Sequence, residues 1–167
     1  LERINKKEYK KAIISAIAAT ANQTLVKNRG HKIDVEVPIV FDNSFESLSK
    51  TADVVKVLKP ILAKELERAK NKKIRSGIRK RKGGKIYPSS AIVVVSKDCP
   101  VIKAARNIAG FDSVKVSDLS VELLAPGAKA GRLAIYTTAA LEEISKLWFY
   151  DSGTLSNYKW KSFEFNR

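Results

Sequence analysis

The chemistry that the sequence indicates most directly is the binding of phosphate groups by a dense run of basic side chains. Residues 70–88 read KNKKIRSGIRKRKGGKIYP, and no Asp or Glu occurs between Glu67 and Asp98. The run therefore contributes +9 to a formal net charge of +15. Its cationic residues are Lys70, Lys72, Lys73, Arg75, Arg79, Lys80, Arg81, Lys82 and Lys85.

A charge run is commonly the solvated face of a helix, with acids interspersed to limit repulsion. This run has no acids, and Gly77, Gly83 and Gly84 disfavour a helix. We therefore predict an extended, irregular arm whose charges neutralise the phosphates of a nucleic acid. Tyr87 is the only aromatic residue in the run. This scarcity favours recognition of the backbone and shape of structured RNA over stacking of single-stranded bases.

The other residues that could do chemistry are weaker candidates. The only histidine, His31, follows an Arg-Gly turn, which is typical of a surface residue rather than a base or a metal ligand. Cys99 precedes a predicted helix, where a thiol could be activated, but Pro100 removes one amide donor there, so we expect a small buried residue. The KGGK of residues 82–85 lacks the spacing of a phosphate-binding loop, and a strand follows it instead of preceding it. We predict no catalytic residue, no metal site and no cofactor.

The length and composition of the chain indicate one folded domain. The chain has 167 residues, 44% of them hydrophobic, which is enough for one sizeable core and excludes general disorder. No apolar run approaches a membrane span, the N-terminus does not resemble a signal peptide, and a single cysteine suits a reducing compartment. We expect a single RNA-binding domain over residues 1–150, with the arm at 70–88, and an aromatic tail at 151–167.

The first half of the chain predicts helices and one short strand. Apolar residues recur at helical spacing over 6–27, with Asn5 as a cap and Gly30 as a stop. Residues 35–41 form a short β-rich run. Thr51 can cap a second helix, which Pro60 should break, so that a third helix starts after it.

After the arm, strands and helices alternate. We predict strands at 91–95, 113–116 and 132–137, and helices at 100–109, at 118–124 and from 139 onward after a Thr138 cap. The uninterrupted apolar run AIVVV is typical of a central parallel strand that is buried on both faces. The predicted fold is therefore α/β, a central parallel sheet covered by helices, with a basic extended arm.

Three strings carry a resemblance to a known family. They are AARNIAG at 104–110, LAPGAKAGRL at 124–133 and IYTTAALEE at 135–143. Together they closely resemble the archaeal and eukaryotic branch of the L-four family of large-subunit ribosomal proteins. AIAATANQTLVKNRGH, VPIVF and the arm follow the same family order, so that the resemblance covers about residues 6 to 147.

The resemblance implies a structural, non-catalytic constituent of the large ribosomal subunit in the cytoplasm. Its expected partners are large-subunit ribosomal RNA and neighbouring ribosomal proteins, with no membrane and no small-molecule substrate. Family members also have an N-terminal part and a long loop that reaches the peptide exit tunnel. This sequence lacks both, so we assign no tunnel-lining role to its residues. The arm departs from the family pattern at Ile78, where a glycine is usual.

Four residues outside the arm are expected to make secondary RNA contacts, with turn formation and capping as the alternative role. They are Arg106, Asn107, Lys129 and Arg132. Two other functions remain open. An RNA-processing enzyme on the same scaffold would need a cluster of carboxylates near the arm. A free regulator that binds messenger RNA would share the features of the ribosomal protein.

Overall fold

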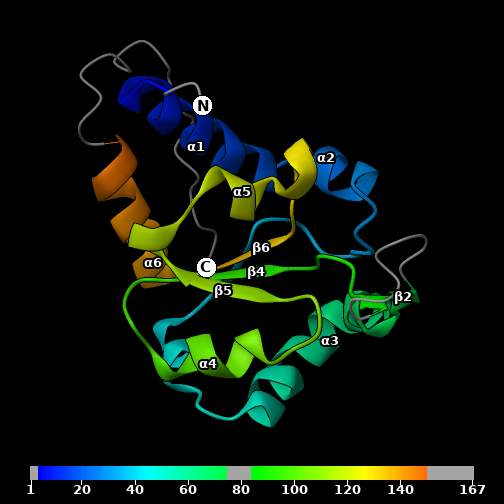
Figure 1. The fold of residues 1–167 in the computed structure, drawn as a ribbon. Coiled ribbons are helices and arrows are strands. Elements are labelled where there is room, and N and C mark those ends of the chain that lie inside the picture. Colours follow the sequence, from blue (N-terminus) through cyan, green and yellow to red (C-terminus); the bar gives the residue numbers. More distant parts are fainter. Residues whose placement is uncertain (1–3, 75–83, 150–167) are drawn as a thin grey trace.

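A four-stranded parallel sheet forms the centre of the fold, as the computed structural model shows for the described residues 4–74 and 84–149 (Figure 1). The strands are β1 (Ile39–Phe41), β4 (Ile92–Val95), β5 (Asp112–Lys115) and β6 (Ala134–Thr137), in the order β1-β6-β4-β5. All three pairings are parallel. β4 lies inside the sheet and is buried along its whole length, which confirms the prediction made from AIVVV.

Helices cover both faces of this sheet (Figure 1). One layer contains α1 (Lys6–Thr20), α5 (Val121–Leu124) and α6 (Thr138–Ile144), and the other contains α3 (Thr51–Lys70) and α4 (Pro100–Arg106). Side chains of β4 alternate between the layers, since Val93 and Val95 pack toward α3 and α4 while Ile92 and Val94 pack toward α1, α5 and α6. The α/β class with helices on both faces is confirmed.

Two helix boundaries differ from the prediction for physical reasons. The expected helix over 6–27 is two helices, because the Asn22 side chain accepts hydrogen bonds from the amides of Thr24 and Leu25 and so caps α2 (Gln23–Asn28). Conversely, Pro60 does not end a helix. α3 continues through it, with non-helical dihedral angles at Leu62 that mark a kink.

Two helix caps lie one residue from their predicted place. α3 starts at Thr51 after a Lys50 cap, and α6 is capped by Thr137. The expected helix at 118–124 is a 3-10 turn, η3 (Val116–Asp118), followed by α5. Irregular helical turns also occur in the described residues: η1 (Asn43–Ser47), η4 (Pro126–Ala128) and the π-helical η5 (Ser145–Phe149).

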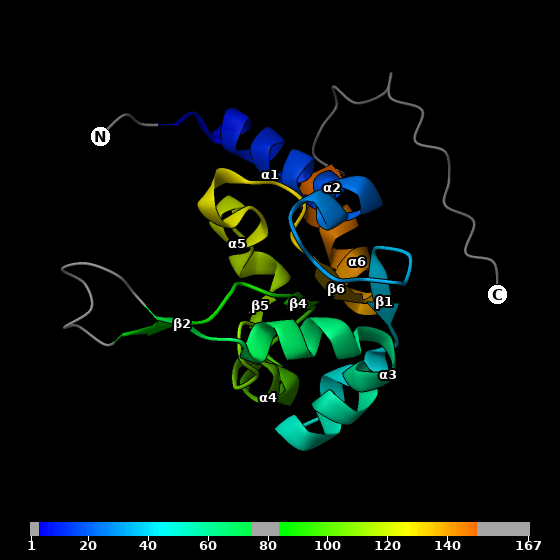
Figure 2. The same cartoon turned by 90° about the vertical axis from the view of Figure 1, so that its right-hand side faces the viewer.

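The two ends of the basic run pair with each other in a short β-ladder, which the sequence did not predict. β2 (Lys73–Ile74) and β3 (Lys85–Ile86) pair antiparallel, with Lys73 opposite Ile86 and Ile74 opposite Lys85. The ladder projects from the body of the fold (Figure 2). Because β4 follows it directly, the arm leaves the molecule at the amino ends of the parallel strands.

Candidate nucleic-acid interface

Four predicted phosphate-binding residues surround the base of the arm. Lys70, Lys72, Lys73 and Lys85 are all exposed. Within the described residues none of their ammonium groups makes an ion pair, and Lys72 Nζ lies 5.2 Å from the centroid of the Tyr87 ring. Their charges therefore remain available to a polyanion. The predicted contacts at Arg75, Arg79, Lys80, Arg81 and Lys82 lie outside the described residues.

A buried carboxylate fixes the base of the arm to the core. The Glu65 side chain, at 0% exposure on the inner face of α3, accepts hydrogen bonds from Arg68 Nη2 at 2.6 Å and from Ser90 Oγ at 2.8 Å. Arg68 also donates to the carbonyl oxygen of Ser89, at the end of the segment that returns from the arm. The helix before the arm and the chain after it are thereby held together.

His31 completes this cluster, which corrects the prediction of a surface histidine. The residue is buried, and its Nδ1 lies 2.7 Å from Glu65 Oε1. The backbone amide of Leu133 donates to Nε2 at 3.4 Å, and Arg68 Nη2 lies 3.2 Å from Nδ1. The histidine therefore joins α3 to the chain just before β6.

Hydrogen bonding keeps Glu65 ionised in the interior. Burial alone would raise its pKa, but hydrogen bonds from His31, Arg68, the Lys32 amide and Ser90 outweigh burial and lower the pKa from 4.5 to about 2. Each carboxylate oxygen accepts at least two of these bonds. Because its hydrogen bonds are all made within the fold, the buried Glu65 carboxylate remains ionised at neutral pH and stabilises the site.

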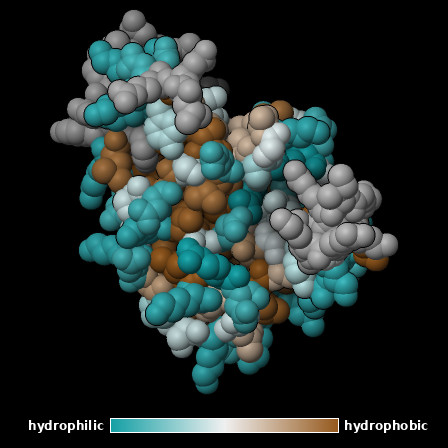
Figure 3. All heavy atoms as spheres, in the orientation of Figure 1, coloured by the Kyte–Doolittle hydropathy of each residue, from teal (hydrophilic) through white to brown (hydrophobic). Residues whose placement is uncertain are grey.

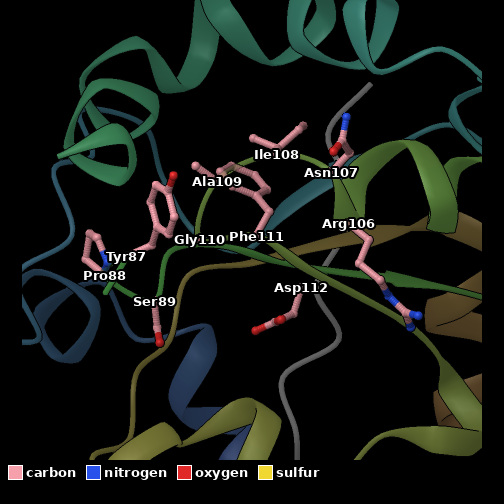
Figure 4. Close-up of a pocket in the computed structure, with 10 residues that line it drawn as sticks. All are labelled: Tyr87, Pro88, Ser89, Arg106, Asn107, Ile108, Ala109, Gly110, Phe111 and Asp112. Atoms are coloured by element: carbon pink, nitrogen blue, oxygen red, sulfur yellow. The ribbon is translucent and has the colours of Figure 1, made fainter. Parts of the chain in front are cut away.

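Arg106 and Asn107 lie at the end of α4, beside a surface depression next to the arm (Figure 4). Both are exposed. Arg106 Nη2 donates to the carbonyl oxygen of Ser113 at 3.3 Å, and its guanidinium points away from Tyr87. The structure thus places Asn107 and Tyr87 in the lining of the same depression and gives Arg106 a bond within the fold.

The LAPG loop is held by an arginine that the sequence did not single out. Arg29 donates to the carbonyl oxygen of Pro126 at 2.7 Å and also to that of Lys129. The Lys129 side chain itself is exposed. Arg29 therefore shapes the loop, and its position after the first two helices gave no local signal of this distant contact.

Arg132 belongs to the interior, where the structure favours its alternative, structural role. Its side chain is 1% exposed, and it donates to the carbonyl oxygens of Ser90 and Leu123 and to Asp112. It joins the amino ends of β4, β5 and β6 instead of facing solvent. We do not include it in the proposed RNA surface.

At the opposite end of the sheet, a carboxylate bridges the carboxyl ends of β4 and β6. In open α/β sheets this end, where the strand order reverses, is the usual ligand crevice. Here Glu46 of η1 accepts hydrogen bonds from Thr137 Oγ1 at 2.6 Å, from Ser96 and from Cys99 Sγ. Burial and this carboxylate raise the pKa of the Cys99 thiol, which is half-buried and not activated.

Other surfaces of the described part lack the features of a chemical site. No three His, Cys, Asp or Glu residues in the described ranges are grouped so that they could hold a metal ion. None of the described helices is long and apolar enough to cross a membrane. Hydrophobic surface gathers between α1 and α5 (Figure 3), in a groove lined mainly by small apolar residues.

Comparison with known proteins agrees with the resemblance in the sequence. Residues 1–147 match the model of the family described as Ribosomal protein L4/L1 family. "Large ribosomal subunit protein uL4" of Methanococcus aeolicus is 48% identical over 150 residues, which cover 87% of this chain and 60% of the relative. The protein of the same name from Archaeoglobus fulgidus is 47% identical over 148 residues, covering 87% and 59%. The chain thus spans about 60% of the length of these relatives, and it belongs to the ribosomal protein L4/L1 family.

Proposed function

We propose that this protein is a structural constituent of the large ribosomal subunit in the cytoplasm and binds large-subunit ribosomal RNA through its basic arm. Its relatives carry the name of a large-subunit protein. The observation that carries the proposal is the concentration of nine cationic residues in 70–88, without an acid, on a base anchored to the core. Neighbouring ribosomal proteins are further partners in this proposal.

The anchored base explains how such an arm could bind with useful affinity. Free arms lose conformational entropy on binding, and a base that is already ordered lowers this cost. The Glu65 cluster and the β2–β3 ladder hold Lys70, Lys72, Lys73 and Lys85 in place before any RNA arrives. The protein then bridges RNA segments by neutralising their phosphates, without chemical change to the RNA.

Salt dependence of RNA binding tests this proposal. If about six to nine arm charges meet phosphates, the logarithm of the affinity should fall against the logarithm of salt concentration with a slope of roughly −4 to −6, at about 0.7 per phosphate as for single strands. Replacing Arg79, Lys80, Arg81 and Lys82 together with alanine should flatten the slope by about 2 to 3. The same number of lysines in α1, replaced together, provides a control of equal charge: Lys6, Lys7, Lys10 and Lys11.

Comparison of the two variants distinguishes specific RNA binding by the arm from a general effect of net charge on RNA binding. The arm variant should lose co-sedimentation with large ribosomal subunits, and the α1 variant should keep it. Equal flattening of the slope by both variants would show that net charge, and not the arm, determines binding. An unchanged slope in the arm variant would refute the assignment.

A further inference from the structure

Two isoleucines of the β2–β3 ladder are exposed at the base of the basic arm. Ile74 is 71% exposed and Ile86 is 46% exposed, and they are two of the four residues that form the ladder. The ladder projects from the body of the fold (Figure 2), so this apolar surface is available to a partner. Contact with a partner would remove it from water, which is favourable.

The register of the ladder places one isoleucine and one lysine on each face. Residues directly opposite each other in an antiparallel pair lie on the same face, and successive residues alternate between the faces. Ile74 lies opposite Lys85, and Lys73 lies opposite Ile86. Both lysines are exposed, and neither makes an ion pair within the described residues. Each face therefore combines an apolar group with a free cation.

Lys72 and Tyr87 extend the face of Ile74 toward the body of the fold. They directly precede and follow the ladder, and Lys72 Nζ lies 5.2 Å from the centroid of the Tyr87 ring. The contact agrees with the alternation, which puts both residues on the same side as Ile74 and Lys85. This face thus carries two lysines, an isoleucine and a tyrosine, all of them exposed.

RNA is the partner that fits such a surface. No Asp or Glu occurs between Glu67 and Asp98, so a polyanion drawn to the lysines will lie against the isoleucines that share their faces. The wide, shallow minor groove of an RNA helix presents sugars and base edges between its phosphates, and unpaired segments do the same. An apolar protein surface would instead bury these lysines without a counter-charge, at a cost in free energy.

We infer that the ladder binds RNA through apolar contacts as well as through charge. Ile74 and Ile86, one on each face, pack against sugars and base edges while Lys85 and Lys73 pair with neighbouring phosphates. This contact rests on the proposed RNA binding and adds to it a part of the affinity that does not depend on salt. Isoleucine also favours strands, so support of the ladder alone is the competing role, and threonine, which is β-branched but polar, separates the two.

The test measures affinity for large-subunit ribosomal RNA, transcribed in vitro, over a series of KCl concentrations. Ile74→Ala should lower the affinity about 3- to 15-fold at every salt concentration without changing the slope, since contacts of roughly one to two CH₂ groups are lost. Ile74→Thr should have a similar effect. Lys85→Ala, on the same face, should instead flatten the slope by about 0.7. Combining Ile74→Ala with Ile86→Ala should multiply their effects, because the two side chains lie on opposite faces.

Ile4→Ala provides the matched control, because Ile4 is 70% exposed and lies before α1, outside the ladder. It should leave the affinity unchanged. Wild-type affinity in Ile74→Thr would show that the isoleucine only supports the strand, and a flatter slope in Ile74→Ala would show that it only positions the lysines. Either result would overturn the apolar contact and leave the arm assignment intact.

Two further outcomes separate this inference from the proposed function. Isoleucine variants that bind the RNA like the wild type but no longer co-sediment with large ribosomal subunits would assign the ladder to a protein partner, against the inference. A wild type whose affinity does not change with salt would refute the proposed binding by the arm, and with it the contact that rests on it.

Discussion

Replacement of Glu65 by glutamine should remove a pH-dependent part of the stability of this fold. The folded pKa of Glu65 is about 2, against an ordinary value of 4.5. A pKa difference of this size corresponds to about 3 kcal/mol of stability when the carboxyl group is ionised in both states. The unfolded chain binds more protons between pH 4.5 and pH 2, so this contribution is complete above about pH 6 and is lost as the pH falls through that window. By pH 3, roughly 1 kcal/mol of it should remain.

The assay is urea denaturation of wild type and Glu65→Gln at several pH values between 7 and 3. At pH 7 the variant should be less stable by about 3 kcal/mol, because a neutral amide has only one acceptor oxygen, and its NH2 group would face the N–H donors of Lys32 and Arg68 that now bond to Oε2. This difference should shrink to roughly 1 kcal/mol at pH 3, where the wild type has itself lost most of the contribution. Glu67→Gln, two residues along α3 and exposed, is the control and should change stability little at any pH.

Two outcomes would refute the reasoning. If the difference between wild type and Glu65→Gln were the same at pH 7 and pH 3, the carboxylate would not titrate in the predicted window. If Glu67→Gln reproduced the effect, the loss would follow from the net charge of α3 and not from the buried cluster.

Three further predictions follow from the same structure. Gly110→Ala should lower Tm by about 6 to 12 °C, because φ is +73° and a Cβ would lie 2.4 Å from a backbone carbonyl oxygen. Gly30→Ala, with a φ of +97° but open space around it, should cost only about 2 to 4 °C, and similar shifts in the two variants would contradict the steric argument. Arg132→Met should destabilise the fold by about 3 kcal/mol in urea denaturation and leave the salt slope of RNA binding unchanged; a flatter slope would return Arg132 to the RNA surface. Cys99 should react slowly with iodoacetamide at neutral pH and faster in Glu46→Gln, since burial and the carboxylate raise the pKa of the thiol; an unchanged rate would exclude that influence.

The sheet was predictable because its signals are local. AIVVV is apolar throughout, as expected for a strand buried on both faces, and the alternation of strands with helices from this point onward implies a parallel sheet. Asn5 and Gly30 mark helix ends through their own backbone and side-chain preferences, and both have those roles in the structure. Such features depend on residues close together in the chain.

The anchor of the arm was not predictable from local signals, because it joins residues that are far apart. His31 and Glu65 are separated by 34 positions, and a histidine beside a glycine turn resembles a surface residue. One clue was present, since Glu65 falls between Leu62 and Leu66 on the inner face of its helix. A carboxylate on a buried face requires a partner, and the chain has only one histidine.

The two ends of the sheet bear differently on the proposed RNA binding. At the carboxyl ends, where α/β sheets commonly bind ligands, Glu46 accepts hydrogen bonds from Ser96, Cys99 and Thr137 and so bridges β4 and β6. At the amino ends, Glu65 ties the helix before the arm to the chain after it. Disruption of the Glu46 cluster should therefore change the reactivity of the Cys99 thiol and leave the affinity for RNA unchanged. Disruption of the Glu65 cluster should loosen the base of the arm. Glu65→Gln should therefore weaken RNA binding even under conditions in which the variant remains folded.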